Sequence, residues 1–200
     1  MRKLIFFVGG AGAGKTTLAK ALAKRRRAAL FDMDTLSRPA SEAIMILSGL
    51  DPSDRDSPVY KSNCRDVGYR LTMDAALENV DIGTDAVVVG PFTREIADSA
   101  WLESELSRIG ASVQDVDVKV VVVGLKDPDL YRARIRDRGS VLDAWKLDHW
   151  DEFRRSLTEV RKVKWSLSED CILYFDNSGP SSADKIAQLE RFAYGSGKTL

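Results

Sequence analysis

The stretch GGAGAGKTT, residues 9–17, limits the possible folds of this 200-residue chain more than any other feature. It satisfies the pattern G-x-x-x-x-G-K-[ST], in which glycines let the backbone approach a phosphate closely. The apolar run KLIFFV at 3–8 comes before it, and a stretch rich in helix formers follows at 15–27. A buried strand, a glycine-rich turn and a helix in this order place the positive end of the helix against an anion. The sequence therefore predicts a nucleotide-binding α/β domain.

The side chains and backbone of this turn match the parts of a phosphate site. Lys15 carries a mobile positive charge suited to the β- and γ-phosphates, the Thr16 hydroxyl can join the shell of a Mg²⁺ ion, and Thr17 suits the α-phosphate. Backbone N–H groups along the turn are expected to face the anion. The predicted cofactor-binding residues here are Gly9, Gly10, Ala11, Gly12, Ala13, Gly14, Lys15, Thr16 and Thr17.

Short apolar runs alternate with helix-forming stretches along the rest of the chain. Further strands are expected at 28–31, 86–90, 117–124 and 171–175. Helical patterns lie near 41–49, 60–79, 93–109, 127–138, 142–165 and 182–194. Strands that alternate with helices favour a parallel sheet with helices on both faces. We expect a single α/β domain over 1–195 and a disordered tail over 196–200.

One segment departs from this alternation. Residues 37–58 are rich in Pro, Ser, Asp and Gly, and with the helix after them they form a long crossover between the second and third strands. Binding and catalytic residues are often carried by such connections on a rigid scaffold. We therefore interpret residues 37–80 as a flap that binds an acceptor molecule.

Composition and charge argue against several classes of protein. Lys and Arg number 30 and so do Asp and Glu, so no overall positive charge attracts nucleic acid or an anionic membrane surface. No apolar run approaches the roughly 18 residues that a membrane span needs. Cys64 and Cys171 match no metal-ligand spacing and are typical of reduced thiols. These features predict a soluble, cytoplasmic protein, a monomer or a homodimer, without nucleic acid as a partner.

Two acids follow the second expected strand in FDMDTL. Asp32 and Asp34 are two positions apart, so in an extended backbone their side chains point the same way, beside the γ-phosphate. One carboxylate could then steer the water shell of the metal while the other accepts a proton from an incoming hydroxyl. A helix N-cap is the alternative role for one of them, although it leaves the other carboxylate unexplained.

Taken together, GGAGAGKTT and FDMDTL resemble the small-molecule P-loop kinases, such as shikimate and gluconate kinases, and the zeta-toxin group. The likeness is closer still to bacterial AAA-type P-loop ATPase/kinase proteins of similar size. It implies a P-loop NTPase domain whose five-stranded parallel sheet has the order 2-3-1-4-5, with ATP as the nucleotide. In such kinases an Asp after the second strand holds the acceptor hydroxyl and can serve as the base. The resemblance places that role on Asp34, with Asp32 nearer Mg²⁺.

Arginines in the stretch DPDLYRARIRDRG recur at helical spacing. Arg134 and Arg138 share one helix face, and Arg132 and Arg136 share another. In kinases that the sequence resembles, a lid helix of this kind folds over the phosphates and supplies charge to the transferring group. We therefore assign a catalytic role to Arg134 and Arg138 in a lid region at 126–150. Ordinary surface positions account for Arg132 and Arg136.

Further candidates concern the adenine and the acceptor. The resemblance places adenine contacts at Asp176 and Asn177, although the letters FDNSGP are also ordinary turn chemistry. Candidate acceptor ligands are Arg65, Arg70 and Arg94, and Arg94 follows GPFT at an expected helix start, which suits an anion. A solvated helix face explains Arg65 and Arg70 equally well.

The combined prediction is a phosphotransferase that moves the γ-phosphoryl group of ATP to a hydroxyl of a small-molecule acceptor. Lys15, Mg²⁺ on Thr16 and the lid arginines would stabilise the spreading charge, while Asp34 orients the acceptor. Two alternatives stay open: a kinase of nucleotides, nucleic-acid ends or an antibiotic, and a nucleotide-dependent regulatory ATPase. The ATPase ranks lower because the strand AVVVGPF ends in Gly90 and Pro91, with no acid to polarise water.

Overall fold

A five-stranded parallel sheet forms the centre of the protein. The computed structural model describes residues 1–158, 162–180 and 182–195. In these residues the sheet has the order β2-β3-β1-β4-β5, as predicted, and each neighbouring pair is parallel. Its strands are β1 (Lys3–Val8), β2 (Ala29–Asp32), β3 (Ala86–Val89), β4 (Asp117–Gly124) and β5 (Ile172–Asp176). The tail predicted over 196–200 lies outside the described residues.

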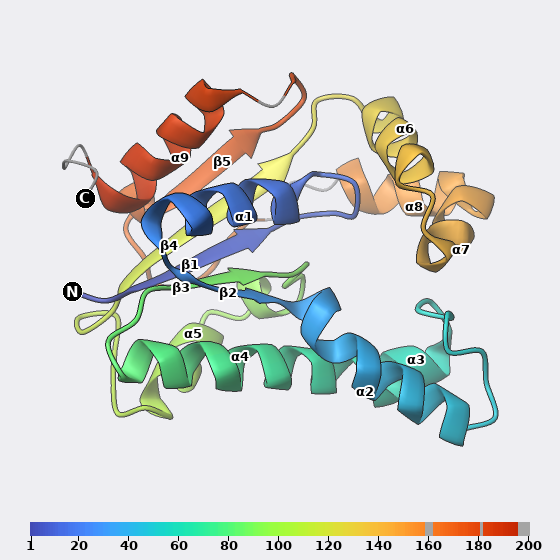
Figure 1. Cartoon of the computed structure of the whole chain (residues 1–200), viewed down its shortest axis with the longest axis horizontal. Helices are drawn as coiled ribbons and strands as arrows, with labels where there is room; N and C mark the ends of the chain where they lie inside the picture. Colours follow the sequence, from blue (N-terminus) through green and yellow to red (C-terminus); the bar gives the residue numbers. More distant parts are fainter. Residues whose placement is uncertain (159–161, 181, 196–200) are drawn as a thin grey trace.

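Helices cover both faces of the sheet (Figure 1). α1 (Lys15–Arg26) and α9 (Ala183–Tyr194) lie on one face, and α4 (Arg65–Asp81) and α5 (Trp101–Ser107) lie on the other. The remaining helices extend beyond the carboxyl ends of the strands. They are α2 (Met33–Leu47), α3 (Pro58–Asn63), α6 (Pro128–Arg138), α7 (Ala144–Asp148) and α8 (Trp150–Thr158).

The central strand shows why the chain forms this layered structure. Successive side chains of β1 point to opposite faces, so Leu4 and Phe6 join the core under α4 while Ile5 and Phe7 join the core under α1. All four are fully buried. A strand that is covered on both faces has no solvent side, and this explains the uninterrupted apolar run KLIFFV.

Helix boundaries differ from the sequence-based expectation in the flap. α2 begins at Met33, not near residue 41, because the Asp32 carboxylate accepts the N–H groups of Asp34 and Thr35 and starts the helix early. The helix expected over 60–79 is divided at Cys64, which ends α3 and precedes α4. Much of the segment that composition marked as a loop is therefore helical.

Two other predicted helices are also interrupted. The stretch expected at 93–109 contains a 3₁₀ turn, η1 (Glu95–Ala97), and then α5. The stretch expected at 142–165 contains η2 (Val141–Asp143), α7 and α8, and its described residues after 161 are not helical. His149 separates α7 from α8 because its ψ of 43° departs from helical geometry. Before β5 lies a third 3₁₀ turn, η3 (Glu169–Cys171).

Candidate functional site

The glycine-rich turn after β1 takes a conformation that side chains would block. Gly9 has a φ of 143°, and a Cβ atom there would overlap the backbone carbonyl of Val123 on β4. Gly12 and Gly14 also have positive φ values, 82° and 88°. Such values are accessible to glycine at little steric cost. The turn leads directly into α1, whose first residue is Lys15, so the positive end of this helix faces the space that the glycine turn surrounds.

Lys15 closes over the turn from which it extends. Its Nζ atom donates a hydrogen bond to the Gly10 carbonyl oxygen at 2.9 Å. The ammonium group is thereby placed beside the backbone that is predicted to hold phosphates. Because the lysine side chain is flexible, its ammonium group can exchange the neutral carbonyl for an anionic partner at little conformational cost.

Thr16 and Asp32 meet at the carboxyl end of β2. The Thr16 hydroxyl donates a hydrogen bond to Asp32 Oδ2 at 2.9 Å, while Asp32 Oδ1 caps α2. Asp32 is 9% exposed, so the carboxylate is held at the edge of the protein interior. A hydroxyl and a carboxylate oxygen in contact form a hard donor set that suits Mg²⁺. The two residues that were predicted to face the metal are thus brought together.

Asp34 does not have the position expected from an extended backbone. Because α2 already begins at Met33, Asp34 lies in the first helical turn and does not continue the strand of Asp32. The two carboxylates therefore do not point the same way, and this part of the prediction is wrong. Asp34 is exposed, whereas Asp32 is buried. The alternative role of helix N-cap applies to Asp32, whose carboxylate both caps α2 and accepts the hydrogen bond from Thr16.

The two lid arginines have different surroundings. Arg134 donates to the Ala13 carbonyl oxygen at 3.4 Å and to the Asn177 carbonyl oxygen at 2.8 Å, so it lies against the phosphate loop. Arg138 is paired with the buried carboxylate of Asp143. This pair lies within the lid and does not bring Arg138 to the loop. Helical spacing alone did not separate these two roles.

Lid and flap approach each other beyond the sheet (Figure 1). The ammonium nitrogen of Lys146 in α7 lies 3.1 Å from Asp143 Oδ1. It also lies 3.9 Å from Oδ2 of Asp56, in the connection between α2 and α3. The ammonium group of Lys61 in α3 lies 5.8 Å from the ring centre of Trp145 in α7. These contacts link the predicted acceptor-binding flap to the predicted lid region.

The acceptor candidates on α4 are engaged with buried acids. Arg65 donates to Glu95 Oε1 at 2.8 Å and stacks on the Tyr69 ring, while Arg70 donates to both carboxylate oxygens of Glu105, at 2.8 and 2.7 Å. The hydrogen bonds to Glu105 raise the pKa of the Arg70 guanidinium above its usual value. Neither arginine is therefore merely solvated, because each compensates a buried acid.

Arg94 and a neighbouring backbone constraint shape the loop after β3. Arg94 is exposed at the start of η1, where a helix longer than one turn was expected. Phe92 is fully buried with a φ of 44°, and its N–H donates to the Tyr69 hydroxyl at 3.1 Å. A bulky residue in the left-handed region is strained and persists where surrounding contacts hold it. No pattern in the sequence predicted this strained turn after β3.

Asp176 and Asn177, the predicted adenine contacts, are hydrogen-bonded within the protein. The Asp176 carboxylate accepts the N–H and hydroxyl of Ser178, which lowers its pKa, and it lies 3.3 Å from the Lys126 ammonium. The Asn177 side chain is buried and donates to the Ala13 carbonyl oxygen at 2.9 Å. Their contact with adenine stays a prediction.

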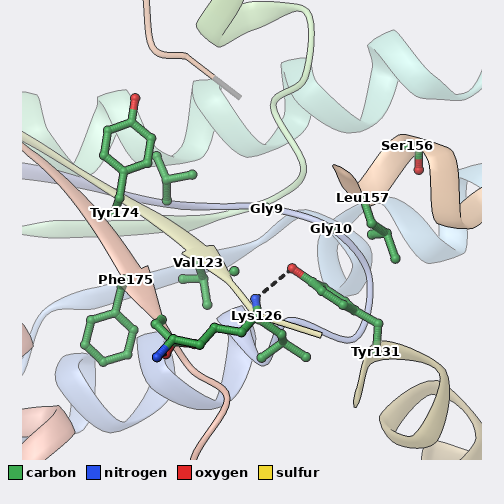
Figure 2. Close-up of a pocket in the computed structure, with 13 residues that line it drawn as sticks. Gly9, Gly10, Val123, Lys126, Tyr131, Ser156, Leu157, Tyr174 and Phe175 are labelled. Carbon is green, nitrogen blue, oxygen red and sulfur yellow. Dashed lines mark hydrogen bonds and ion pairs between the residues drawn. The ribbon is translucent and has the colours of Figure 1, made fainter. Parts of the chain in front are cut away.

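A cavity of about 300 Å³ adjoins the first residues of the phosphate loop. Figure 2 shows Tyr131 and Leu157 beside Gly9 and Gly10, with Tyr174 and Phe175 on opposite faces of β5. The Tyr131 hydroxyl accepts the N–H of Leu125 at 2.9 Å (dashed line in Figure 2). No sequence pattern predicts this cavity, because its lining residues come from separate elements. These are the start of the phosphate loop, the ends of β4 and β5, and the helices α6 and α8.

The family model described as AAA domain matches residues 4–160. No curated protein sequence matches the chain significantly. Among the described residues, no helix is both long and apolar enough to cross a membrane.

Similar solved structures share the architecture at low sequence identity. A provisionally assigned kinase from Chloroflexus aurantiacus J-10-fl has a TM-score of 0.64 at 18% identity, over 96% of this chain and 98% of the other. A sugar kinase from Janibacter sp. HTCC2649 has a TM-score of 0.58 at 14% identity, over 98% and 97%. A gluconokinase from Sinorhizobium meliloti 1021 has a TM-score of 0.52 at 16% identity, over 96% and 91%. At these identities the likeness shows the fold.

Proposed function

The chain belongs to the AAA domain family, and from this premise we propose that it is an ATP-dependent phosphotransferase that moves the γ-phosphoryl group of ATP to a hydroxyl of a small-molecule acceptor. The observation that carries the proposal is the hydrogen bond of 2.9 Å that the Thr16 hydroxyl donates to Asp32 Oδ2. Thr16 directly follows Lys15 and the glycine turn. This contact supports the proposal because a hydroxyl and a carboxylate, which suit Mg²⁺, lie beside a turn that suits phosphate.

The nucleotide and its metal fit the residues present. Bound ATP·Mg²⁺ would supply the transferable phosphoryl group and neutralise part of its charge. Thr16 and Asp32 would hold the metal, directly or through its water shell, and the glycine turn leaves space for phosphate where side chains would intrude. Lys15 would exchange the Gly10 carbonyl for the phosphates, and Arg134 lies against the same loop. The chain's contribution is thus mainly orientation and charge stabilisation.

Asp34 is proposed to orient the acceptor. It lies exposed in the first turn of α2, two residues after the proposed metal residue Asp32. From this position its carboxylate can accept a hydrogen bond from the acceptor hydroxyl and then its proton, as the phosphoryl group arrives. The flap in α2 and α3 and the lid in α6 and α7 would surround the acceptor and exclude water.

The proposal of a hydroxyl acceptor is supported by two structural neighbours. The Janibacter protein is described as a sugar kinase and the Sinorhizobium protein as a gluconokinase, and both align with more than nine-tenths of this chain. Sugars and sugar acids carry several hydroxyls, so they are the first class of acceptor to try.

The direct test is consumption of ATP by the purified protein with Mg²⁺, alone and with a panel of sugars, sugar acids, other hydroxy acids, nucleosides and aminoglycosides. We expect one compound to accelerate ATP consumption and to appear as a phosphorylated product by mass spectrometry. Removal of Mg²⁺ by a chelator is the control and should stop the reaction. Slow hydrolysis that no compound changes would contradict the transfer reaction and favour a regulatory ATPase.

A further inference from the structure

Asn177 connects the end of the sheet to the phosphate loop. Its backbone N–H donates to the Gly124 carbonyl oxygen at 2.8 Å, which extends the pairing of β5 with β4 by one residue. Its side-chain Nδ2 donates to the Ala13 carbonyl oxygen at 2.9 Å. The residue is 7% exposed. A buried side chain anchored by the sheet therefore holds one carbonyl of the loop.

Two cations complete the hydrogen bonding of Asn177. Lys185, in the first turn of α9, donates to Asn177 Oδ1 at 3.0 Å and to the Gly179 carbonyl oxygen at 2.7 Å. Arg134 donates to the Asn177 backbone carbonyl and to the same Ala13 oxygen as Nδ2. Both polar atoms of the Asn177 amide are thus hydrogen-bonded, and the amide cannot turn over without losing these bonds.

Holding the Ala13 carbonyl fixes the direction of a phosphate donor. The Ala13 C=O and the Gly14 N–H belong to one planar trans peptide, so they point in opposite directions. With the carbonyl directed at Asn177, the Gly14 N–H points away from it, next to Lys15. Gly14 also permits the close approach, because a Cβ atom there would lie 2.5 Å from Asn177 Nδ2.

From this geometry we infer that Asn177 is a positioning residue, which orients the Ala13–Gly14 peptide so that the loop is preorganised for the phosphates of ATP. This inference rests on the proposed function, because it assumes that the loop binds ATP. It differs from the expected contact between Asn177 and adenine, because here the side chain acts through the loop. A preorganised donor increases affinity because it need not be ordered on binding.

The test compares Asn177→Ala with Asn177→Asp. Both substitutions remove the donor to Ala13, but the aspartate keeps an acceptor for Lys185. The matched control is Asn79→Ala, because Asn79 donates in the same way to a backbone carbonyl, that of Ala75 at 2.9 Å, within α4. Binding of a fluorescent N-methylanthraniloyl-ATP with Mg²⁺ is measured well below each variant's melting temperature, together with KM for ATP and kcat.

We expect both Asn177 variants to weaken nucleotide binding about tenfold and to raise KM for ATP by a similar factor, while kcat changes less. The aspartate should not rescue binding, because an oxygen would then face the Ala13 oxygen. The Asn79 variant should bind as the wild type does. Wild-type affinity in folded Asn177 variants, or in Asn177→Asp alone, would overturn the inference. A wild-type protein that binds no ATP would instead overturn the proposed function.

Discussion

The two sides of the candidate site are built differently. On the nucleotide side, the loop at residues 9–17 is anchored between strands, and its Ala13 carbonyl is held by Asn177 and Arg134. On the proposed acceptor side, α2 packs through one stripe of buried residues, and no residue of α3 is buried. Leu47 at the end of α2 is 87% exposed. The first side is constrained by the sheet, whereas the second is held by one face of α2 and by contacts of its surface residues with α4 and the lid.

The stripe that holds α2 is small and partly polar. Its buried members are Met33, Ser37, Ser41 and Met45, and a Cβ at Gly68 of α4 would lie 3.2 Å from the Ser37 Cβ. Small side chains allow close packing but bury little apolar area, so they contribute less stabilisation than leucines would. Regions with few buried apolar contacts open at low free-energy cost. The comparison therefore suggests a rigid nucleotide side and a more easily displaced acceptor side.

The largest effect is expected on the nucleotide side from Lys15→Ala. The substitution removes the charge that the loop holds beside the phosphates, so turnover with any acceptor should fall by about 1,000-fold. Lys20→Ala is the control, because Lys20 is exposed on the same helix. Both variants should melt within a few degrees of the wild type. Near-normal turnover in Lys15→Ala would refute the catalytic role of this lysine.

Asp34→Asn should affect the acceptor side alone. Loss of the carboxylate removes the proposed proton acceptor, so kcat should fall by about 100-fold while the dissociation constant for ATP is unchanged. Asp81→Asn, an exposed acid at the far end of α4, is the control. Steady-state kinetics with direct nucleotide binding separates the two quantities. Unchanged phosphotransfer in Asp34→Asn would remove this residue from the mechanism.

The arginines of the lid should separate into two classes. Arg134→Ala removes a cation that lies on the phosphate loop, and we expect a loss of about 50-fold in kcat/KM for ATP. Arg138→Ala removes one of the two cations that pair with the buried Asp143, the other being Lys146, so it should mainly lower the melting temperature. Kinetics and thermal unfolding of both variants give the comparison. Equal kinetic losses in two well-folded variants would show that the lid rearranges around the nucleotide.

The smallest effect on activity is expected from Arg65→Met, which acts on stability instead. This change leaves the buried Glu95 carboxylate without its cation, and the free energy of unfolding should fall by about 2–3 kcal/mol. Urea denaturation measures the loss, and the double variant Arg65→Met/Glu95→Gln should recover part of it. If stability is unchanged but the acceptor's KM rises, Arg65 belongs to the acceptor site after all.

Local sequence was sufficient wherever a function depends on consecutive residues. The glycine turn is recognisable because its glycines, the lysine and the threonine follow one another along the chain. The strand before it and the helix after it each have a residue pattern of their own. The parallel sheet followed from the alternation of apolar runs with helices. Thr16 and Asp32, predicted to face the metal, lie in contact although they come from separate elements, and their binding of Mg²⁺ stays a prediction.

Local sequence did not show the contacts that neighbouring elements decide. Asp34 was expected in an extended chain, but the cap made by Asp32 begins a helix one residue later. Arg70 was offered as an acceptor ligand, yet Glu105, which is 35 positions away, engages it. Arg138 shares a helix face with Arg134 but is taken by Asp143. A one-dimensional pattern contains no information on which distant acid a given arginine meets.

By itself the sequence determined the nucleotide end of this protein: a phosphate loop on a buried strand, within a parallel α/β domain. Backbone conformation and helix polarity are set by residues close in the chain, so that end can be deduced locally. Only the tertiary structure decided how the loop is held by Asn177, which arginines stay available, and where the cavity beside Tyr131 lies. Those features depend on side chains from separate elements, and their positions are fixed only when the sheet and its helices come together.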